Sequence, residues 1–348
     1  MVAVSPVVSR ARRRLLIVSD GRPGHYRQSE GVAMALGRLR ATVVDRVELR
    51  LRSQPLGRLL ARAVASGLLS PSFALRLGYG HSTLPAAADV VISSGGRTLL
   101  ANVALARLLG APNVFSGTLR GLPAEAFAAV VQPYAEAAGK PRHVVALKPS
   151  PVDPDAMRAP EPWPEGRRAA LLVGGPSGAH GFSDADWAGL RTLVAAPGRI
   201  AWRVVTSPRT PGEAADQLIA AAGASVEAVV DFRSAGPGSI AAALDWADAV
   251  ACTEDSSSMI VEAVCARRPV LALLPSARRL RPDEAGMLDS LAARGLLARR
   301  PLAGIEPAEA DRALGEARPL IANPLDDLAR ALAPMLGWAD LSAAAGSV

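Results

Sequence analysis

The stretch TEDSSSMIVEA at residues 253–263 directly follows ADAVAC at residues 247–252, an apolar run typical of a buried parallel strand. From Met259 onward, apolar side chains recur at helical spacing. A strand, a hydroxyl-rich turn and a helix N-terminus together favour anion binding, because free backbone N–H groups and the helix dipole attract negative charge. The alternative interpretation is an ordinary helix start, since Ser and Asp are preferred N-cap residues.

Strand-like and helix-like segments alternate on both sides of this stretch. Strands are predicted at 15–19, 42–49, 88–93, 112–116, 128–132, 169–173, 200–205, 226–230, 247–252 and 270–274. Helices are predicted at 27–39, 56–69, 98–109, 184–194, 212–222, 240–246, 284–294 and 325–336, besides the one after residue 258. This alternation predicts an α/β protein with parallel sheets and helices on both faces.

A chain of 348 residues is long enough for two domains. A proline-rich segment at 151–167 lacks periodicity and is interpreted as a linker. We therefore expect an N-terminal domain at 1–150, a C-terminal domain at 168–320, and a helix and tail at 321–348. Two parallel sheets facing each other across a cleft would bind ligands at the carboxyl ends of their strands.

Positive charge is concentrated in the first hundred residues. They hold 15 Arg and 5 acids, a net charge of 15 − 5 = +10, so a net total of +7 leaves 7 − 10 = −3 for the rest. Such asymmetry indicates an anionic partner. Nucleic acid is not expected, because no zinc finger, basic helix or aromatic RNA motif accompanies the charge. An anionic membrane surface is the other candidate. The apolar, arginine-containing segment 55–69 would suit a lipid interface, although an ordinary packed helix explains it as well.

Other features narrow the class of protein. No apolar run approaches the ~20 residues of a membrane span. The N-terminal charge follows the first apolar piece, the wrong order for a secretory signal, so we expect a cytoplasmic protein.

Cys252 and Cys265 are interpreted as small buried side chains in a reducing compartment. Asp184 and Asp186 follow Ser183 at a predicted helix start, which favours capping over metal binding. No metal or cofactor is predicted.

The first predicted strand ends in a glycine-rich turn with a histidine. Gly21 and Gly24 allow a sharp turn and close approach of a ligand. His25 suits a general base, with Asp20 near enough to orient it, whereas the alternative is a loop histidine that caps the helix. We also expect Gln28 to contribute to an acceptor or anion site here. The other histidines are weaker candidates: His81, His143, which is expected in a strand, and His180, which could contact a ligand.

A second turn of this kind follows the strand at 88–93. Gly95 and Gly96 expose backbone donors, and Arg97 supplies a fixed positive charge suited to phosphate or carboxylate. We expect this turn to lie beside the first one on the same edge of the sheet. The small-residue turn at 116–118 is a third candidate on that edge.

The turns after the predicted strands at 169–173, 200–205 and 247–252 offer groups suited to a nucleotide diphosphate. They combine glycines, hydroxyls, one arginine and a helix N-terminus, and Glu262 lies one helical turn further along, where it could reach ribose hydroxyls. The predicted donor site comprises Gly174, Gly175, Pro176, Ser207, Arg209, Thr253, Glu254, Asp255, Ser256, Ser257, Ser258, Met259 and Glu262.

The motifs DGRPGHYRQSEG, ISSGGRT, GGPSG and TEDSSSMIVEA occur in this order along the chain. In them the sequence resembles the plant "elongated mitochondria" family of mitochondrial fission, and still more its bacterial relatives, over residues 15–320. The resemblance implies the GT-B architecture, two Rossmann-like domains with a nucleotide-sugar bound by the second. The first turn is also similar to that of the enzyme that adds N-acetylglucosamine to lipid-linked muramyl peptide. His25 falls on the histidine of that turn, whereas Arg22 and Pro23 replace smaller residues.

The leading hypothesis is a metal-independent, inverting glycosyltransferase. It would move a sugar from a nucleotide-diphosphate sugar to the hydroxyl of an unidentified acceptor, lipid-linked or otherwise anionic, at the inner membrane face. His25, alone or with Asp20, would be the base. The first alternative is a nucleotide-sugar 2-epimerase of the same architecture, using Asp20, His25, Glu254 and Asp255. The second is a non-catalytic adaptor that recruits a partner to membranes.

Overall fold

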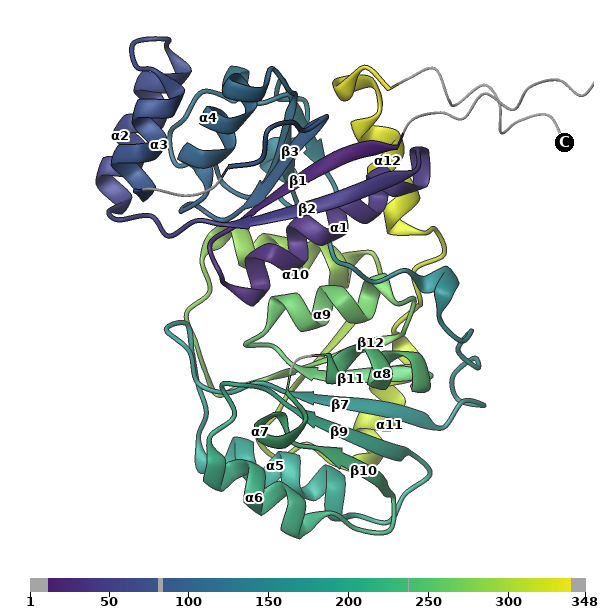
Figure 1. The fold of residues 1–348 in the computed structure, drawn as a ribbon. Helices are drawn as coiled ribbons and strands as arrows, with labels where there is room; N and C mark the ends of the chain where they lie inside the picture. Colours follow the sequence, from purple (N-terminus) through teal and green to yellow (C-terminus); the bar gives the residue numbers. More distant parts are fainter. Residues whose placement is uncertain (1–11, 81–83, 237, 339–348) are drawn as a thin grey trace, which may run out of the picture. The chain divides into compact units, whose positions relative to one another are not determined.

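The computed structural model describes residues 12–80, 84–236 and 238–338, so the predictions made for His81 and the extreme N-terminus lie outside the described residues (Figure 1). The chain forms two compact units. Unit 1 contains the described residues up to Pro151 and those from Pro324 onward, and unit 2 runs from Val152 to Asn323. The C-terminal helix therefore belongs to the same unit as the N-terminal half.

Unit 1 is built on a six-stranded parallel sheet with the strand order β2-β1-β3-β4-β5-β6. The strands are β1 (Arg13–Ser19), β2 (Thr42–Glu48), β3 (Val90–Ser94), β4 (Asn113–Ser116), β5 (Ala129–Gln132) and β6 (His143–Val145). The helices are α1 (Pro23–Leu39), α2 (Gln54–Ala65), α3 (Pro71–Tyr79), α4 (Leu99–Leu109) and α12 (Pro324–Leu332), with short 3-10 turns η1 (Ala124–Ala126), η2 (Ala135–Ala137) and η4 (Pro334–Leu336).

Alternation along β1 divides the apolar side chains of unit 1 between two cores. Leu16 and Val18 pack with side chains of α2, α3 and α4 on one face. Leu15 and Ile17 pack with α1 and α12 on the other face. Arg38 of α1 also donates a hydrogen bond of 2.8 Å to Asp326 of α12. The sheet is therefore buried on both faces, as the near-continuous apolar strands predict.

Unit 2 repeats this plan with the parallel strand order β10-β9-β7-β11-β12-β14. Its main strands are β7 (Arg168–Val173), β9 (Ala201–Thr206), β10 (Val226–Val230), β11 (Ala249–Thr253), β12 (Val270–Leu274) and β14 (Leu297–Pro301), and the short strands β8 (His180–Gly181) and β13 (Ala277–Arg278) pair antiparallel. The helices are α5 (Asp184–Ala195), α6 (Gly212–Ala221), α7 (Phe232–Ala235), α8 (Ser239–Trp246), α9 (Ser257–Cys265), α10 (Pro282–Ala293) and α11 (Pro307–Glu316), with a 3-10 turn η3 (Pro154–Ala156).

The helices of unit 2 cover both faces of its sheet. Apolar side chains of α5, α6 and α11 pack with β7, β9, β11 and β12 in one core. Helices α8 and α9 contact the same strands and lie in front of them in Figure 1. Both cysteines are buried in this unit, and burial raises the pKa of the Cys252 thiol and raises that of Cys265 to about 12. The interpretation of both cysteines as buried side chains is confirmed.

Several element boundaries differ from the predictions. Helix α1 begins at Pro23 instead of Arg27, because proline is well suited to the first position of a helix, and His25 therefore lies in its first turn. Helix α2 ends at Ala65, and Gly67 then adopts a left-handed conformation with φ +79°. Helix α3, strand β14 and helix α11 were not predicted. The prediction that Ser183 caps a helix is confirmed by a reciprocal capping box with Asp186.

The proline-rich segment interpreted as a linker packs against unit 2 for most of its length. Arg158 and Arg168 both bind the carboxylate of Asp248, a side chain that is only 1% exposed. Burial opposes ionisation of this carboxyl group, but hydrogen bonds from Arg168, the Glu161 backbone and Arg158 outweigh it and lower its pKa to about 2. This segment therefore forms part of the folded unit.

Candidate functional site

The candidate donor site lies in unit 2, at the carboxyl ends of β7, β9 and β11. These three strands are neighbours in the sheet. The hydroxyl of Thr253 accepts a hydrogen bond of 2.7 Å from Gly174 N. The hydroxyl of Thr210 donates to the carbonyls of Val173 at 3.0 Å and Gly174 at 2.7 Å. The three turns expected to lie at strand carboxyl ends are thus tied together, and Thr210 is a contributor that the sequence reasoning missed.

The two glycines after β7 are required by the protein's own packing. A Cβ atom on Gly174 would lie 2.1 Å from Asp255 Oδ2, and one on Gly175 would lie 2.0 Å from the carbonyl oxygen of Arg209. Both distances are far shorter than any real Cβ contact. Glycine is therefore needed at both positions to let the β9 and β11 turns approach.

Asp255 is the anchor of this arrangement. Its side chain is fully buried, and Oδ2 accepts hydrogen bonds from Gly175 N at 3.1 Å and from the guanidinium of Arg209 at 2.5 Å. The side chain of Arg209 remains 43% exposed. Arg209 is thus fixed by a buried partner, with part of its side chain facing solvent.

Glu254 holds the neighbouring strands together. Its buried carboxylate pairs with Arg278 of β13 and with Arg299 of β14, the latter at 3.0 Å. The buried ring of His180 lies 3.9 Å from the same carboxylate through Nε2 and 3.3 Å from the Ser177 hydroxyl through Nδ1. The carboxylates of Glu254 and Asp255 therefore both serve ion pairs within unit 2. Their partners lie too far along the chain for a local motif to reveal them.

The N-terminus of α9 lies at this junction, and few side chains cap its backbone N–H groups. Its first turn contains no acidic side chain, and the N-cap residue Ser256 makes no side-chain capping hydrogen bond. Ser256 and Ser258 are partly exposed, whereas Ser257 is buried. The first backbone N–H groups of a helix have no intrahelical partner. This end of α9 is therefore suited to bind an anion.

The remaining residues of the predicted donor site differ in their exposure to solvent. Pro176 is exposed and Ser207 is partly exposed. Met259 and Glu262 are 6% and 7% exposed. The role of Glu262 in binding ribose stays a prediction.

The candidate acceptor site lies in unit 1, at the carboxyl end of β1. The Nδ1 atom of His25 lies 2.9 Å from Asp20 Oδ2 and 3.1 Å from Oδ1. The Asp20 side chain is 1% exposed and that of His25 is 28% exposed. Because a carboxylate only accepts hydrogen bonds, Nδ1 of His25 carries the proton of this hydrogen bond. The lone pair of Nε2 is then left to accept a proton. The expected proximity of Asp20 and His25 is confirmed.

The second glycine-rich turn supports this pair from β3. Gly95 has φ +88°, and a Cβ atom there would lie 2.3 Å from His25 Nδ1. Gly96 has no such restriction, since its nearest atoms would be those of Arg120 at 3.7 Å. The position of the imidazole therefore requires glycine at residue 95 and not at 96.

Gln28 connects the three turns of unit 1. Its Oε1 accepts hydrogen bonds from Ser94 Oγ at 3.2 Å and Ser116 Oγ at 3.1 Å, and its Nε2 donates to the Gly24 carbonyl at 2.9 Å. This confirms that the turns after β1, β3 and β4 lie along one edge of the sheet. Gln28 serves this connection through both ends of its amide.

A pocket of about 400 Å³ opens beside the Asp20–His25 pair. It is lined by Asp20, Gly21, Arg22, Glu48, Arg50, Leu51 and Arg97. The Arg97 carbonyl accepts a hydrogen bond of 2.7 Å from the hydroxyl of Tyr79, whose pKa is raised by burial. Arg22, Glu48 and Arg50 were not predicted as site residues. Glu48 reaches the pocket because it pairs in register with Ser19, the last residue of β1.

Two sheets of parallel strands, each carrying glycine-rich turns at its carboxyl edge, define the GT-B class of protein with two Rossmann-like domains. Three solved structures share this fold: the glycosyltransferase SnogD from Streptomyces nogalater (16% identity, TM-score 0.50, 94% of this chain and 96% of that chain), Acinetobacter baumannii MurG (15%, 0.51, 93% and 99%) and the UDP-GlcNAc 2-epimerase from Neisseria meningitidis bound to UDP-GlcNAc (12%, 0.52, 93% and 99%).

The family model of mitochondrial fission ELM1 matches residues 23–335, and the chain belongs to that family. The resemblance noted in its sequence motifs is thereby confirmed. A search of curated proteins found no match. The similarity to the solved structures is at low identity and therefore shows the fold.

Proposed function

We propose that this protein is an inverting glycosyltransferase that uses a nucleotide-diphosphate sugar. The observation that carries the proposal is the Asp20–His25 pair, in which a buried carboxylate orients a partly exposed imidazole. Such a pair at the carboxyl edge of a parallel sheet has the components of a general base. The glycosyltransferase and the UDP-GlcNAc 2-epimerase that share the fold support a nucleotide-sugar as the substrate class.

In the proposed reaction, Nε2 of His25 takes the proton of an acceptor hydroxyl as its oxygen attacks the anomeric carbon of the sugar. The bond from that carbon to the phosphate oxygen breaks, and the nucleoside diphosphate leaves with both electrons of the bond. Attack from the side opposite the leaving group inverts the configuration. Asp20 keeps the Nδ1 proton in place and stabilises the imidazolium that forms.

The donor half of the proposal assigns the diphosphate to unit 2. The N-terminus of α9 and the exposed part of Arg209 would stabilise the negative charge that builds up on the leaving diphosphate. Partly exposed Ser256 and Ser258 would add hydroxyl donors. These groups supply positive potential from the chain itself, so we propose a metal-independent reaction.

The geometry favours transfer over epimerisation. The alternative 2-epimerase would use Glu254 and Asp255 as acid and base groups together with Asp20 and His25. Both carboxylates are engaged by arginines, Glu254 by Arg278 and Arg299 and Asp255 by Arg209. Both side chains are buried and already paired within unit 2, which favours a structural role for them over acid or base catalysis.

The acceptor is proposed to carry negative charge. Three arginines, Arg22, Arg50 and Arg97, line the pocket beside Asp20, against the two carboxylates of Asp20 and Glu48. These three guanidinium groups outnumber the two carboxylates, so the pocket favours a ligand that carries negative charge. A phosphate or carboxylate next to the reacting hydroxyl would meet this requirement, and a lipid-linked acceptor would bring the enzyme to a membrane surface.

Calorimetric titration with UDP, GDP, ADP, dTDP and UDP-GlcNAc tests the donor site, with Ser258→Asp and Ser258→Ala as matched variants. An acid in the first turn suits the helix dipole, so the Asp variant should fold as well as the wild type while repelling a diphosphate. We expect one nucleotide to bind, about tenfold or more weaker binding to Ser258→Asp, and a smaller loss of affinity for Ser258→Ala, which removes only one hydroxyl donor. At ~100 times its dissociation constant that nucleotide should add about 2.7 kcal/mol to the free energy of unfolding.

The absence of binding by all five compounds would contradict the proposal and favour the adaptor alternative. Equal affinities of the wild type and Ser258→Asp would place the nucleotide elsewhere in the protein.

A further inference from the structure

We propose that unit 1 docks onto an anionic lipid bilayer through one surface of α2 and α3. This α2–α3 surface comprises the exposed side chains of Arg58, Leu59, Arg62, Leu68, Phe73, Arg76 and Leu77. It differs from both candidate sites in composition and in the residues that form it, and the proposal does not depend on glycosyl transfer.

Large apolar side chains on this surface are strongly exposed. Leu68 is 83% exposed, Leu59 65%, Phe73 52% and Leu77 39%. Leu68 lies in the turn between the two helices, and the other three lie on the helices themselves. Leaving such side chains in water is unfavourable, and exposed apolar side chains on two helices that contact each other indicate an interaction site.

Both helices are already anchored by their opposite faces. Helix α2 buries Leu60, Ala61 and Val64, and α3 buries Ala74 and Leu75 in the core of unit 1. On α3 the exposed residues Phe73, Arg76 and Leu77 are spaced by three and four positions and therefore share the outward face. The exposed leucines and phenylalanine are thus surplus to the packing of the domain.

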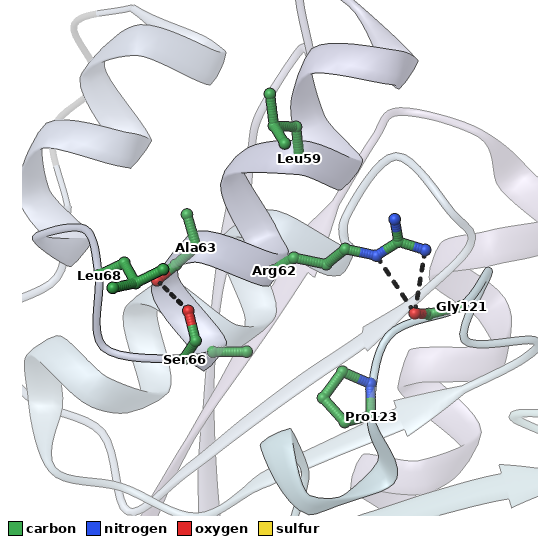
Figure 2. A pocket seen from close by; sticks show the side chains of 8 residues that line it. Leu59, Arg62, Ala63, Ser66, Leu68, Gly121 and Pro123 are labelled. Atoms are coloured by element: carbon green, nitrogen blue, oxygen red, sulfur yellow. Dashed lines mark hydrogen bonds between the residues drawn. The ribbon is translucent and has the colours of Figure 1, made fainter.

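A shallow pocket of about 480 Å³ lies on this surface, between α2 and the loop at residues 121–123 (Figure 2). Leu59, Ala63, Leu68 and Pro123 supply apolar walls. Arg62 donates hydrogen bonds of 3.3 and 3.2 Å to the carbonyl of Gly121 and so ties the loop to the helix. A pocket with apolar walls next to a guanidinium suits the upper part of a lipid chain below its headgroup.

The charge of this part of the chain selects an anionic partner. Residues 49–124 contain eight arginines and a single acid, Asp89, a net charge of 8 − 1 = +7. That acid is already bound by the side chain of Arg13 and the backbone N–H of Arg14. Arg58, Arg62 and Arg76 therefore alternate with apolar side chains in a strongly basic segment of the chain. Arginine stems can lie along apolar surface while their guanidinium groups reach lipid phosphates.

A bilayer fits these observations better than a second copy of the chain. A symmetric dimer would bring this arginine-rich surface against itself, with like charges opposed. Nucleic acid would leave the exposed leucines without a partner. Apolar side chains at the level of the acyl chains and arginines at the level of the headgroups match the layers of an anionic interface.

Co-sedimentation of the full-length protein with vesicles tests the proposal, using phosphatidylcholine alone and phosphatidylcholine with 30% phosphatidylglycerol. We expect binding to the anionic vesicles that weakens as salt rises, because exposed charges are screened. Leu68→Ser with Phe73→Ser, and separately Arg58→Glu with Arg76→Glu, should each reduce the bound fraction about tenfold. The matched control is Ile321→Ser with Arg318→Glu on unit 2, where Ile321 is 92% exposed, and it should bind like the wild type.

Circular dichroism and nucleotide titration of the same variants separate loss of docking from loss of folding or of the donor site. Docking should be lost while the melting temperature and any nucleotide affinity stay at the wild-type value. The proposal is overturned if anionic vesicles do not bind the wild type or if the variants bind vesicles as well as the control does. It is also overturned if the only effect of the substitutions is to convert a dimer of the chain to a monomer.

Discussion

Each unit holds a buried aspartate in a turn at the carboxyl end of a strand, β1 in unit 1 and β11 in unit 2, but the two aspartates meet different partners. In unit 1, Asp20 meets the imidazole of His25. In unit 2, Asp255 meets the guanidinium of Arg209 and the backbone N–H of Gly175. A glycine permits the contact in both cases, Gly95 against His25 and Gly174 against Asp255. The fold repeats, while the chemistry depends on which side chain the carboxylate meets.

The difference separates the proposed roles of the two units. An imidazole changes protonation near neutral pH, so a carboxylate that orients it prepares a proton acceptor. A guanidinium stays charged at all physiological pH values, so a carboxylate that holds it fixes a positive charge in place. Unit 1 is therefore suited to proton transfer and unit 2 to binding a developing negative charge.

Replacement of His25 should have the largest effect. His25→Gln removes the proposed base, and loss of general base catalysis lowers rates by ~10²–10⁴-fold. The measurement is release of nucleoside diphosphate from the donor identified by titration, with a membrane lipid extract as the source of acceptor. Donor affinity should stay at the wild-type value. A variant that keeps its rate would remove His25 from the mechanism.

Replacing each of the two buried aspartates with asparagine tests directly whether the two units differ in role. Asp20→Asn should lower the rate by ~10²-fold with donor affinity unchanged, because the carboxylate orients the imidazole and stabilises its charged form. Asp255→Asn should instead weaken donor binding and lower the melting temperature, because Arg209 loses its buried counter-charge. Calorimetry and single-turnover rates on both variants distinguish these outcomes. Similar profiles for the two variants would contradict the division of roles.

Gly95→Ala and Gly96→Ala form a matched pair in unit 1. The methyl group at residue 95 would meet His25 Nδ1 and would also force alanine to φ +88°, so the imidazole must move. A small misplacement of a catalytic group can cost ~10²-fold in rate, and we expect a loss of tenfold or more. Gly96→Ala should keep the rate within about twofold, since its methyl group makes ordinary contacts. Equal rates in the pair would show that the position of His25 is not constrained as described.

Gly174→Ala and Gly178→Ala form a matched pair in unit 2, and the difference in stability between them is the smallest effect that we expect. A methyl group at residue 174 would push against Asp255, whereas one at residue 178 has no atom within 4 Å. Overpacking of this kind typically costs about 1–3 kcal/mol. Thermal unfolding should therefore show a lower melting temperature and weaker nucleotide binding for Gly174→Ala only. If Gly178→Ala were equally harmful, the close approach of the β7 and β11 turns would not be the cause.

Local patterns predicted most of the regular structure. The strands at 226–230 and 270–274 were predicted with the boundaries that the structure has, because each is a short apolar run between turn residues. The proximity of Asp20 and His25 followed from their separation of five residues. By contrast, the first turn of α1 was missed, because glycine and proline in RPGH indicate a turn as readily as a helix start. Helix α3 was missed as well, although Ser70, Pro71 and Gly80 are start and stop signals of a helix.

The sequence by itself determined the alternation of strands and helices, the glycine-rich turns at the strand ends and the excess of arginine in the first half. These properties depend on residues close together in the chain. Only the tertiary structure decided that Glu48 lies next to Ser19, that Glu254 is neutralised by Arg278 and Arg299, and that Gly175 lies against Arg209. The reason is physical, because the order and register of strands in a sheet bring distant residues together, and local periodicity carries no information about that order.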